Sequence, residues 1–516
     1  MSRSAPGWRP GRDRRAVWHP PVDGAPDDRQ QHHVVVVGGG IAGLAAATAL
    51  AERGVRVTLL ESEPRLGGRV SAWPVTAAGD ATTMSRGFHA FFRQYYNLRS
   101  LLRRSDPGLS RLVPVADYPL TLKDGPTDSF AKVARTPPLN LLTFVARSPS
   151  FPVRDLARVD VAAALGLLDV EFPRTFTDHD GISAAQVLDR LRFPETARHL
   201  ALEVFARSFF ADPRDFSGGE LVAMFHSYFV GSAEGLLFDV PDDDYDTALW
   251  APLGRHLAGL GVQVRTSTRA TGLDKRDGGV VVRLEEGEVA ADAVVLATDR
   301  APLRQLVADA PWLGDELWRE SVGRGAVAPP FVVWRLWLDR RVRAGTPPFR
   351  ATSGFGPLDN VSAVELLEKG AAAWSAENGG SVVELHAYAV RPGVTEAELR
   401  GQLWSELEHL HPELAGAEVV HEQWLWREDC PMVGTDPWAA RPGVRTPDPR
   451  VVLAGDGVRC ELPVALMERA ATTGWQAGNA LLEGWGLAGH GLWTVPMRGR
   501  HRGVRTLRRL VARTPA

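Results

Sequence analysis

The sequence predicts an α/β fold in which a nucleotide-binding domain with a parallel sheet is interrupted by a second, α+β domain. Three observations lead to this prediction. Residues 34–62 have the pattern of strand, glycine turn, helix and second strand. Residues 115–249 and 310–440 break that pattern with apolar helices and strand-like runs, and residues 451–457 return to a short strand that ends in glycine. An inserted domain between parts of one sheet explains this order.

The first strand, Val34–Val37, is followed by Gly38, Gly40 and Gly43 in GxGxxG spacing. In such a unit the first glycine permits a tight turn, the second lets the backbone approach a pyrophosphate, and the third lets the helix pack against the strand. The helix expected at 42–53 would direct its positive N-terminal end toward the phosphates. The motif is weak alone, but this context predicts a Rossmann-like dinucleotide site.

The second strand, residues 55–60, leads to Glu61, an acid placed to accept hydrogen bonds from a ribose diol. Gly67, Gly68 and Arg69 follow closely, and a guanidinium there suits the same pyrophosphate. The alternative for these three residues is a plain turn with a solvated arginine.

This order of motifs resembles the flavin amine oxidase and carotene desaturase superfamily, in which the Gly-Gly-Arg turn holds FAD. The resemblance covers about residues 34–493. It implies an FAD-dependent oxidoreductase of the flavin amine oxidase type, with a Rossmann-like FAD-binding domain and an inserted α+β substrate domain made of a mixed sheet and a helical roof. Because only one dinucleotide fold is visible, we expect the electrons to pass on to a quinone or to oxygen.

The resemblance and the local patterns divide the chain into four parts. We expect residues 1–33, which are rich in proline and arginine and lack isoleucine, leucine and phenylalanine, to be disordered. The FAD-binding domain is expected at 34–114, 250–309 and 441–493, the substrate-binding domain at 115–249 and 310–440, and a basic tail at 494–516.

Composition narrows the function classes. A chain of 516 residues is too long to fold around one hydrophobic core, so we expect more than one domain. The net charge of −3 gives no reason to expect nucleic-acid binding. The two cysteines, Cys430 and Cys460, are too few for a disulfide framework or a metal cluster, which suits a reducing compartment. No apolar run is long enough to span a bilayer. We therefore expect a cytoplasmic protein without a metal.

Residues 87–98, GFHAFFRQYYNL, are polar and aromatic, and on composition alone they suit a protein core. Plant-type phytoene and ζ-carotene desaturases carry a similar Gly-x-His-x-Phe-Phe segment. The version in this sequence is most similar to that of the isorenieratene synthases, the β-carotene desaturase/methyltransferase family. The resemblance implies that Gly87 and His89 lie beside the isoalloxazine ring.

Residues 451–457 are expected to form a short strand that ends in Gly455 and Asp456, before a helix expected at 464–483. In the superfamily a matching aspartate binds the flavin ribityl chain, and the N-terminus of the following helix faces the pyrimidine end of the ring, where its dipole stabilises negative charge. The chain near Ala270 is expected to pass the adenine. The residues expected to bind FAD are Gly38, Gly40, Ile41, Ala42, Gly43, Glu61, Gly67, Gly68, Arg69, Gly87, His89, Ala270, Gly455, Asp456 and Val464.

The sequence departs from the plant-type desaturases at residues 460–463 and 467–470 and in the acid-rich segment 242–246. These departures bring carboxylates into segments expected near the flavin. The candidate catalytic acids and bases are Glu234, Asp239, Asp242 and Glu461, with His89 positioning the substrate or shuttling a proton. Each of these acids could instead be a surface or capping residue.

The resemblance implies conversion of the β-ionone rings of β-carotene to aromatic rings, by desaturation with methyl migration. Because this substrate dissolves in lipid, we expect peripheral attachment to the inner face of the membrane. Residues 497–516, with seven arginines and no acid, suit anionic headgroups. The alternatives are a linear carotene desaturase, an amine or protoporphyrinogen oxidase, or a non-catalytic lipid carrier.

Overall fold

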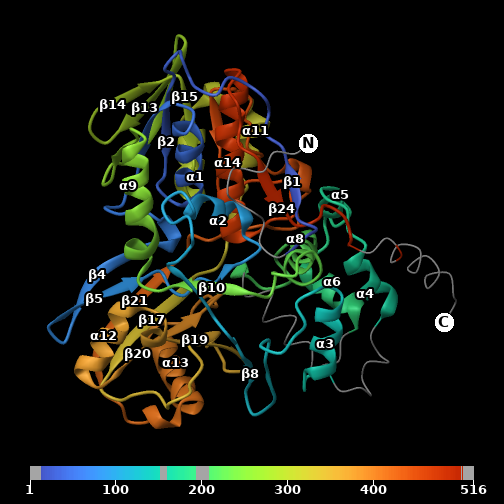
Figure 1. Cartoon of the computed structure of the whole chain (residues 1–516), viewed down its shortest axis with the longest axis vertical. Coiled ribbons are helices and arrows are strands. Elements are labelled where there is room, and N and C mark those ends of the chain that lie inside the picture. Colours follow the sequence, from blue (N-terminus) through green and yellow to red (C-terminus); the bar gives the residue numbers. More distant parts are fainter. Residues whose placement is uncertain (1–12, 152–159, 193–208, 501–502, 504–516) are drawn as a thin grey trace.

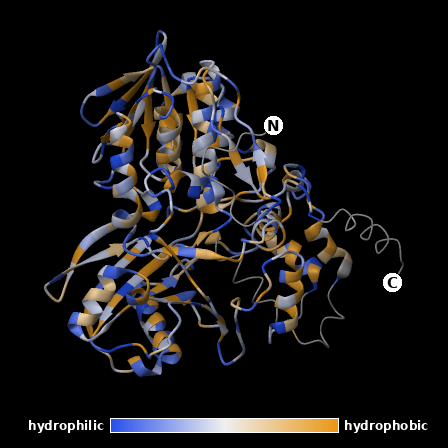
Figure 2. Ribbon diagram, viewed as in Figure 1, coloured by the Kyte–Doolittle hydropathy of each residue, from blue (hydrophilic) through white to orange (hydrophobic). Residues whose placement is uncertain are grey.

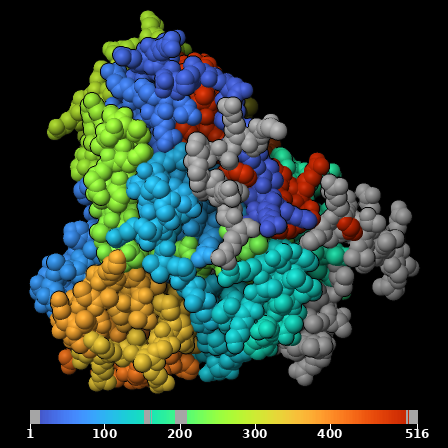
Figure 3. All heavy atoms as spheres, viewed as in Figure 1, coloured from blue at the N-terminus to red at the C-terminus, as the bar shows by residue number. Residues whose placement is uncertain are grey.

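The computed structural model describes residues 13–151, 160–192, 209–500 and 503, which form the predicted α/β fold. Figure 1 shows a nucleotide-binding domain above a second domain that contains a larger sheet, with a group of helices at its side. In Figure 3 the two parts of the second domain lie side by side, one in yellow and orange and the other in teal.

The upper domain is built on a five-stranded parallel sheet in the order β11-β3-β2-β15-β23. Its strands are β11 (Gln263–Arg265), β3 (Arg56–Leu60), β2 (His33–Val37), β15 (Ala293–Leu296) and β23 (Val451–Leu453). The central strands are continuously hydrophobic because both faces of the sheet are covered (Figure 2). The sheet therefore joins stretches of chain that are far apart in the sequence.

Helices cover one face of this sheet, and a small antiparallel sheet together with two further helices covers the other. The helices of the first face are α1 (Ile41–Ala51), α2 (Tyr96–Leu102), α9 (Ala251–Gly259) and α14 (Leu466–Gly484). The second face carries β12 (Ala270–Arg276), β13 (Gly279–Leu284), β14 (Glu288–Ala291), α10 (Arg300–Ala308) and α11 (Glu316–Gly323). Helices α1 and α14 approach closely because of Gly474, where an added Cβ would lie 2.2 Å from the carbonyl oxygen of Ala42.

The hydrophobic run at residues 289–297 predicts a single strand, and this prediction is wrong. Strand β14 ends at Ala291 and belongs to the antiparallel sheet, whereas β15 begins at Ala293 and belongs to the parallel sheet. Asp292 marks the change of sheet, and its carboxylate accepts a 2.6 Å hydrogen bond from the backbone N–H of His33.

The lower domain contains a mixed seven-stranded sheet in the order β21-β17-β20-β19-β18-β8-β9. Its strands are β21 (Val419–Arg427), β17 (Phe331–Leu338), β20 (Ser381–Ala387), β19 (Asn360–Ala363), β18 (Phe349–Ser353), β8 (Leu120–Leu122) and β9 (Thr127–Asp128). Helices α12 (Lys369–Asn378) and α13 (Glu396–Leu410) pack against it. The apolar runs of residues 115–249 predict helices, but β8 and β9 lie in this segment, so it contributes to the sheet as well as to the roof.

Helices form most of the remaining roof. They are α3 (Leu139–Arg147), α4 (Val161–Leu168), α5 (Arg174–Thr177), α6 (Ala184–Leu191) and α8 (Gly218–Phe225). The apolar run at residues 202–210 predicts a helix, most of which falls outside the described residues. Shorter strands pair nearby: β4 (Ala72–Ala77) with β5 (Asp80–Ser85), β16 (Ala326–Val327) with β22 (Pro431–Met432), and β10 (Phe238–Pro241) with both β6 (Phe91–Phe92) and β7 (Leu112–Pro114). Among the helices of the described residues, none has the length and apolar character needed to cross a bilayer.

The two ends of the described chain are held together. Strand β1 (Val17–His19) pairs with β24 (Leu492–Thr494), and the ring centroids of Trp18 and Trp493 lie 4.9 Å apart. The Arg500 guanidinium lies 2.8 Å from the carboxylate of Asp13. The expected disorder of residues 1–33 is therefore wrong for residues 13–33, and packed structure continues to residue 500. Val504, Leu507 and Val511, which recur at helical spacing in the basic tail, lie outside the described residues.

Candidate active site

A continuous cavity of about 900 Å³ lies between the parallel sheet and the seven-stranded sheet. Its upper end is formed where β2, β3, β15 and β23 finish, with Gly38, Glu61, Ala297 and Gly455 in its wall. Ligands of open parallel sheets bind in this position, outside the carboxyl ends of the strands. The motifs predicted from the sequence therefore converge on one site.

The glycine turn joins β2 to α1 through backbone shapes that other residues do not fit. Gly38 has φ of 110°, and a Cβ added at Gly43 would lie 1.8 Å from the carbonyl oxygen of Gly38. Helix α1 begins after Gly40 without a side-chain cap, and Ile41 and Ala42 line the cavity. Gly43 itself lies behind the wall, where it permits the close packing of the helix.

Glu61 is buried at the end of β3 and holds the turn from the adjacent strand. Its carboxylate accepts hydrogen bonds from the backbone N–H groups of Gly39, at 2.7 Å, and Glu63, at 2.8 Å. Ala270, at the start of β12, lines the same part of the cavity. Glu61 and Ala270 therefore lie in the wall of the same cavity, and the role of Glu61 beside a ribose stays a prediction.

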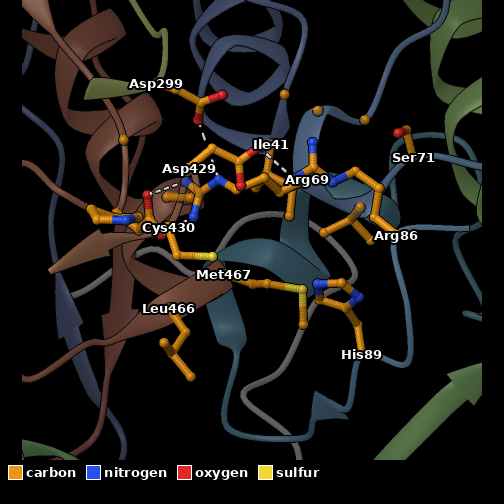
Figure 4. A pocket seen from close by; sticks show the side chains of 18 of the residues that line it. Ile41, Arg69, Ser71, Arg86, His89, Asp299, Asp429, Cys430, Leu466 and Met467 are labelled. Atoms are coloured by element: carbon orange, nitrogen blue, oxygen red, sulfur yellow. Dashed lines mark hydrogen bonds and ion pairs between the residues drawn. The ribbon is translucent and has the colours of Figure 1, made fainter. Parts of the chain in front are cut away.

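A charged cluster marks the middle of the cavity. Arg69 forms a bidentate pair with Asp456, at 2.9 and 2.5 Å. Its Nε lies 3.2 Å from Asp299, and Figure 4 shows these two side chains facing each other. Burial alone would raise the pKa of Asp456, but the Arg69 guanidinium outweighs it and lowers that pKa. Burial raises the pKa of Asp299, which Arg69 offsets only in part. Gly67, Gly68 and Gly455 border this cluster.

His89 lies further along the cavity, on a loop that Tyr245 holds in place. The Tyr245 hydroxyl donates to the carbonyl of Gly87 and accepts from the backbone N–H of His89, both at 2.9 Å. The His89 Nδ1–H donates to the Gly87 carbonyl at 2.8 Å, so Nε2 is the acceptor nitrogen of the neutral ring. Burial lowers the pKa of His89 to about 4. Gly87 does not line the cavity, but its φ of 100° shapes the loop.

The N-terminal end of α14 closes the cavity opposite His89. Leu466, Met467 and Ala470 line it, and Figure 4 shows the Met467 side chain extending toward the His89 ring. Val464 was expected here but does not line the cavity, because the helix begins two residues later, at Leu466. Leu466 and Met467, rather than Val464, therefore form the cavity wall at this helix terminus.

The four candidate catalytic acids do not line the cavity. Asp239, in β10, is ion-paired with both Arg93 and Arg99. Asp242 is ion-paired with Arg111, at 2.8 Å, and with Lys369. The expectation that these carboxylates face the flavin is therefore wrong, because each is held by cations of neighbouring segments.

The other two acids lie elsewhere for different reasons. Glu234 is buried in the turn before β10, away from the cavity wall. Glu461 is exposed at the surface. The acid-rich segment 242–246 contacts the His89 loop through the hydroxyl of Tyr245.

Sequence reasoning missed several polar residues in the cavity wall. Arg86 pairs with Asp429 at 2.5 Å, and burial raises the pKa of the adjacent Cys430 to about 12. Arg86 directly precedes the Gly87–His89 segment, so its position could have been inferred. Asp429 and Cys430 come from a loop after β21, and no local pattern marks them.

These residues fit an anionic dinucleotide with a polyol chain. The uncapped end of α1 offers backbone N–H donors, Arg69 supplies a cation, and Glu61 supplies an acceptor. A Cβ added at Gly455 would enter open space, so the backbone there leaves room for a ligand. The donor set and the open cradle therefore agree with the expected FAD.

Comparisons with known proteins agree with this geometry. A family model described as flavin containing amine oxidoreductase matches residues 41–482. The carotenoid phi-ring synthase of Streptomyces griseus is 54% identical, over 99% of this chain and 98% of its own length. The carotenoid phi-ring synthase of Chlorobaculum tepidum is 28% identical, over 89% of this chain and 90% of its own.

Solved structures match the fold at lower identity. A putrescine oxidase variant superimposes with a TM-score of 0.65 at 16% identity, and the match covers 88% of this chain and 99% of that one. A putative protoporphyrinogen oxidase from Exiguobacterium superimposes with a TM-score of 0.59 at 18% identity, and the match covers 87% and 98%. These likenesses establish the fold, and the predicted flavin amine oxidase architecture is confirmed.

Proposed function

The chain belongs to the family of flavin-containing amine oxidoreductases, and from this premise we propose that it aromatises β-ionone rings of a carotenoid. It is an FAD-dependent oxidoreductase. The proposed substrate is β-carotene, and the proposed reaction couples desaturation to migration of one methyl group, which yields isorenieratene when both rings react. The full-length similarity to two carotenoid phi-ring synthases supports a carotenoid substrate.

The observation that carries this proposal is the composition of the lower part of the cavity. Beyond His89 its wall is largely aromatic, which suits a rigid, conjugated hydrocarbon and offers few charged groups to an amine. The aromatic residues of this part are Phe88, Phe92, Tyr95, Tyr118, Phe130, Phe210, Phe238, Phe331, Phe349 and Tyr388. The cavity is continuous with the flavin-binding end, so a ring inserted there reaches the cofactor.

The chemistry of the ring requires more than desaturation. A β-ionone ring has a quaternary carbon with two methyl groups, so it cannot become aromatic unless one methyl group moves. Aromatisation of one ring removes four hydrogens, which corresponds to two rounds of two-electron oxidation. FAD, when bound, accepts a hydride in each round. The protein must then hold the cationic ring while the methyl group migrates and must remove a proton.

We assign His89 to positioning this ring. With its pKa lowered to about 4, the imidazole is neutral at physiological pH, and the Gly87 carbonyl fixes its orientation. A neutral ring beside Met467 presents a polarisable surface to the substrate without adding a positive charge that would repel a cation.

Incubation of the FAD-loaded protein with β-carotene and an electron acceptor tests the proposed reaction. We expect a pigment that has lost four hydrogens for each converted ring and whose proton NMR spectrum contains aromatic signals and one relocated methyl group. Heat-treated protein is the control. Products that gain double bonds only in the open chain would identify a linear desaturase, and recovery of unchanged pigment would exclude the carotenoid reaction.

We also propose that the protein works on the inner face of the cytoplasmic membrane and passes electrons to a quinone or to oxygen. A lipid-dissolved substrate favours this location, and the basic residues beyond 500 suit an anionic surface.

Truncation after Arg500 should weaken binding to anionic liposomes at least about tenfold, because each basic residue near such a surface contributes about 1 kcal/mol. The cut must follow Arg500, since removal of β24 or of the Arg500–Asp13 pair would damage the folded protein. Co-sedimentation with anionic and with neutral liposomes measures the effect, and the neutral liposomes serve as the control. Equal sedimentation of the full and truncated chains with anionic liposomes would show that the tail does not contribute to membrane attachment.

A further inference from the structure

Three polar residues alternate along β20 and its end, away from the candidate acids discussed above. Glu384, His386 and Tyr388 are two residues apart, so their side chains point to the same face of the strand. The His386 Nε2 lies 2.8 Å from the Glu384 carboxylate, and the His386 Nδ1 lies 2.7 Å from the Tyr388 hydroxyl. They form a hydrogen-bonded relay.

The relay has a fixed charge at its inner end. Arg335, directly opposite Glu384 on the neighbouring strand β17, donates to the Glu384 carboxylate at 2.8 Å, and Glu384 is 1% exposed. Burial alone would raise the pKa of Glu384, but Arg335 and His386 outweigh it and hold that pKa at about 2. The ionised Glu384 accepts the Nε2–H of His386, which leaves Nδ1 to accept the proton of the Tyr388 hydroxyl.

The outer end of the relay opens into the aromatic part of the cavity. His386 and Tyr388 both line it, near Phe210, whose ring centroid lies 4.5 Å from that of Tyr388. The amide of Asn360 donates to the Tyr388 oxygen at 3.0 Å and so fixes the hydroxyl. The Tyr388 hydroxyl is therefore oriented by the Asn360 amide as donor and by the His386 Nδ1 as acceptor.

We propose that Tyr388 is the catalytic residue that removes the proton from the cationic ring, with His386 and Glu384 as positioning residues. This inference rests on the proposed function. In this step the ring C–H bond breaks, and its electron pair completes a double bond of the ring. The proton goes to the Tyr388 oxygen while the hydroxyl proton of Tyr388 passes to the His386 Nδ1. The positive charge of the ring thus becomes that of an imidazolium paired with the Glu384 carboxylate.

His89 also lines the cavity, but its surroundings do not favour this task. Its Nδ1–H donates to the neutral carbonyl of Gly87, so no carboxylate compensates an imidazolium at that position. His386 has such a partner at 2.8 Å. A buried cation is costly unless an opposite charge is within a few ångströms, so the proton is better accommodated at His386 than at His89.

Two measurements separate the proton step from hydride transfer. Bleaching of the flavin absorbance in a single turnover without oxygen reports the first hydride transfer. NMR of the pigment extracted after repeated turnover with an electron acceptor reports aromatic rings, which require two oxidations. For Tyr388→Phe and for His386→Gln we expect flavin bleaching near the wild-type rate and a loss of aromatic product of about 100-fold, the contribution of a general base. His89→Gln should retain more aromatic product than either.

Tyr96→Phe is the matched control. Tyr96 does not line the cavity, and its hydroxyl is hydrogen-bonded to the Ser232 hydroxyl at 3.1 Å, outside the relay, so its removal should leave both signals unchanged. Wild-type levels of aromatic product in Tyr388→Phe would overturn the inference, as would loss of FAD from both relay variants, which would indicate a structural role. Loss confined to His89→Gln would transfer the role to His89. A wild-type protein that forms no aromatic ring would overturn the proposed function itself.

Discussion

The Glu61→Ala variant should be purified largely without FAD. The buried Glu61 carboxylate holds the backbone N–H groups of Gly39 and Glu63 and would also receive the ribose hydroxyls. A hydrogen bond to a charged group contributes about 1.5–3 kcal/mol, so the loss of these bonds should weaken FAD binding on the order of 100-fold. The ratio of flavin to protein absorbance after purification, and titration of the apoprotein with FAD, measure the change.

Two further variants make this result specific. Glu61→Gln keeps one acceptor oxygen and should bind FAD with intermediate affinity. Glu288→Ala removes an exposed carboxylate from β14 of the same domain and should bind FAD as the wild type does, which controls for the change in net charge. FAD occupancy and affinity in Glu61→Ala equal to those of Glu288→Ala would exclude Glu61 from the cofactor site.

The cofactor end of the site was predictable because its requirements are local. Gly38 needs a positive φ, and Gly43 must lack a side chain beside the Gly38 carbonyl, so both appear in the sequence as glycine at fixed spacing. Glu61 directly follows a hydrophobic strand and Asp456 comes three residues after another, and parallel strands bring their carboxyl ends to the same edge of a sheet. Most of the residues predicted to bind FAD accordingly line the cavity.

The catalytic end was not predictable in the same way because ion pairs between distant segments decide which acids face the cavity. Asp239 is held by Arg93 and Arg99, about 140 residues away in the sequence, and no local pattern reveals this. The relay of Glu384, His386 and Tyr388 does have a local signal, polar residues at alternating positions of a predicted strand. Its importance appears only when Arg335 is placed opposite Glu384 by the pairing of β17 with β20.

The Arg335→Met variant should be strongly destabilised. Arg335 is 1% exposed, and its guanidinium lies 2.8 Å from Glu384 and 3.1 Å from Glu368. Its replacement leaves two buried carboxylates without their shared cation, which costs about 3–5 kcal/mol. Urea denaturation of the FAD-loaded protein at pH 7 measures the loss. Arg214→Met, which removes an exposed arginine paired with Asp212, should leave the stability nearly unchanged.

The dependence of stability on pH should have the opposite sign in Arg335→Met and in the wild type. In the wild type the pKa of Glu384 is about 2, below its ordinary value of 4.5, so its contribution to stability is complete above pH 4.5 and is lost as the pH falls toward 2. Burial already raises the pKa of Glu368. Without Arg335 burial should raise both pKa values, so the variant should gain stability between pH 7 and pH 5 as the carboxylates take up protons. Equal slopes of stability against pH in both proteins would contradict this account.

A triple variant separates unpaired charge from lost packing. Arg335→Met combined with Glu368→Gln and Glu384→Gln removes the cation together with both anions and nearly preserves side-chain volume. Because most of the cost of breaking a buried ion pair is the charge left behind, the triple variant should recover most of the stability lost in Arg335→Met, and its stability should no longer rise between pH 7 and pH 5. If it is as unstable as Arg335→Met, the bonds from Arg335 to the Thr83 carbonyl and the Ser85 hydroxyl, rather than its charge, stabilise this part of the sheet.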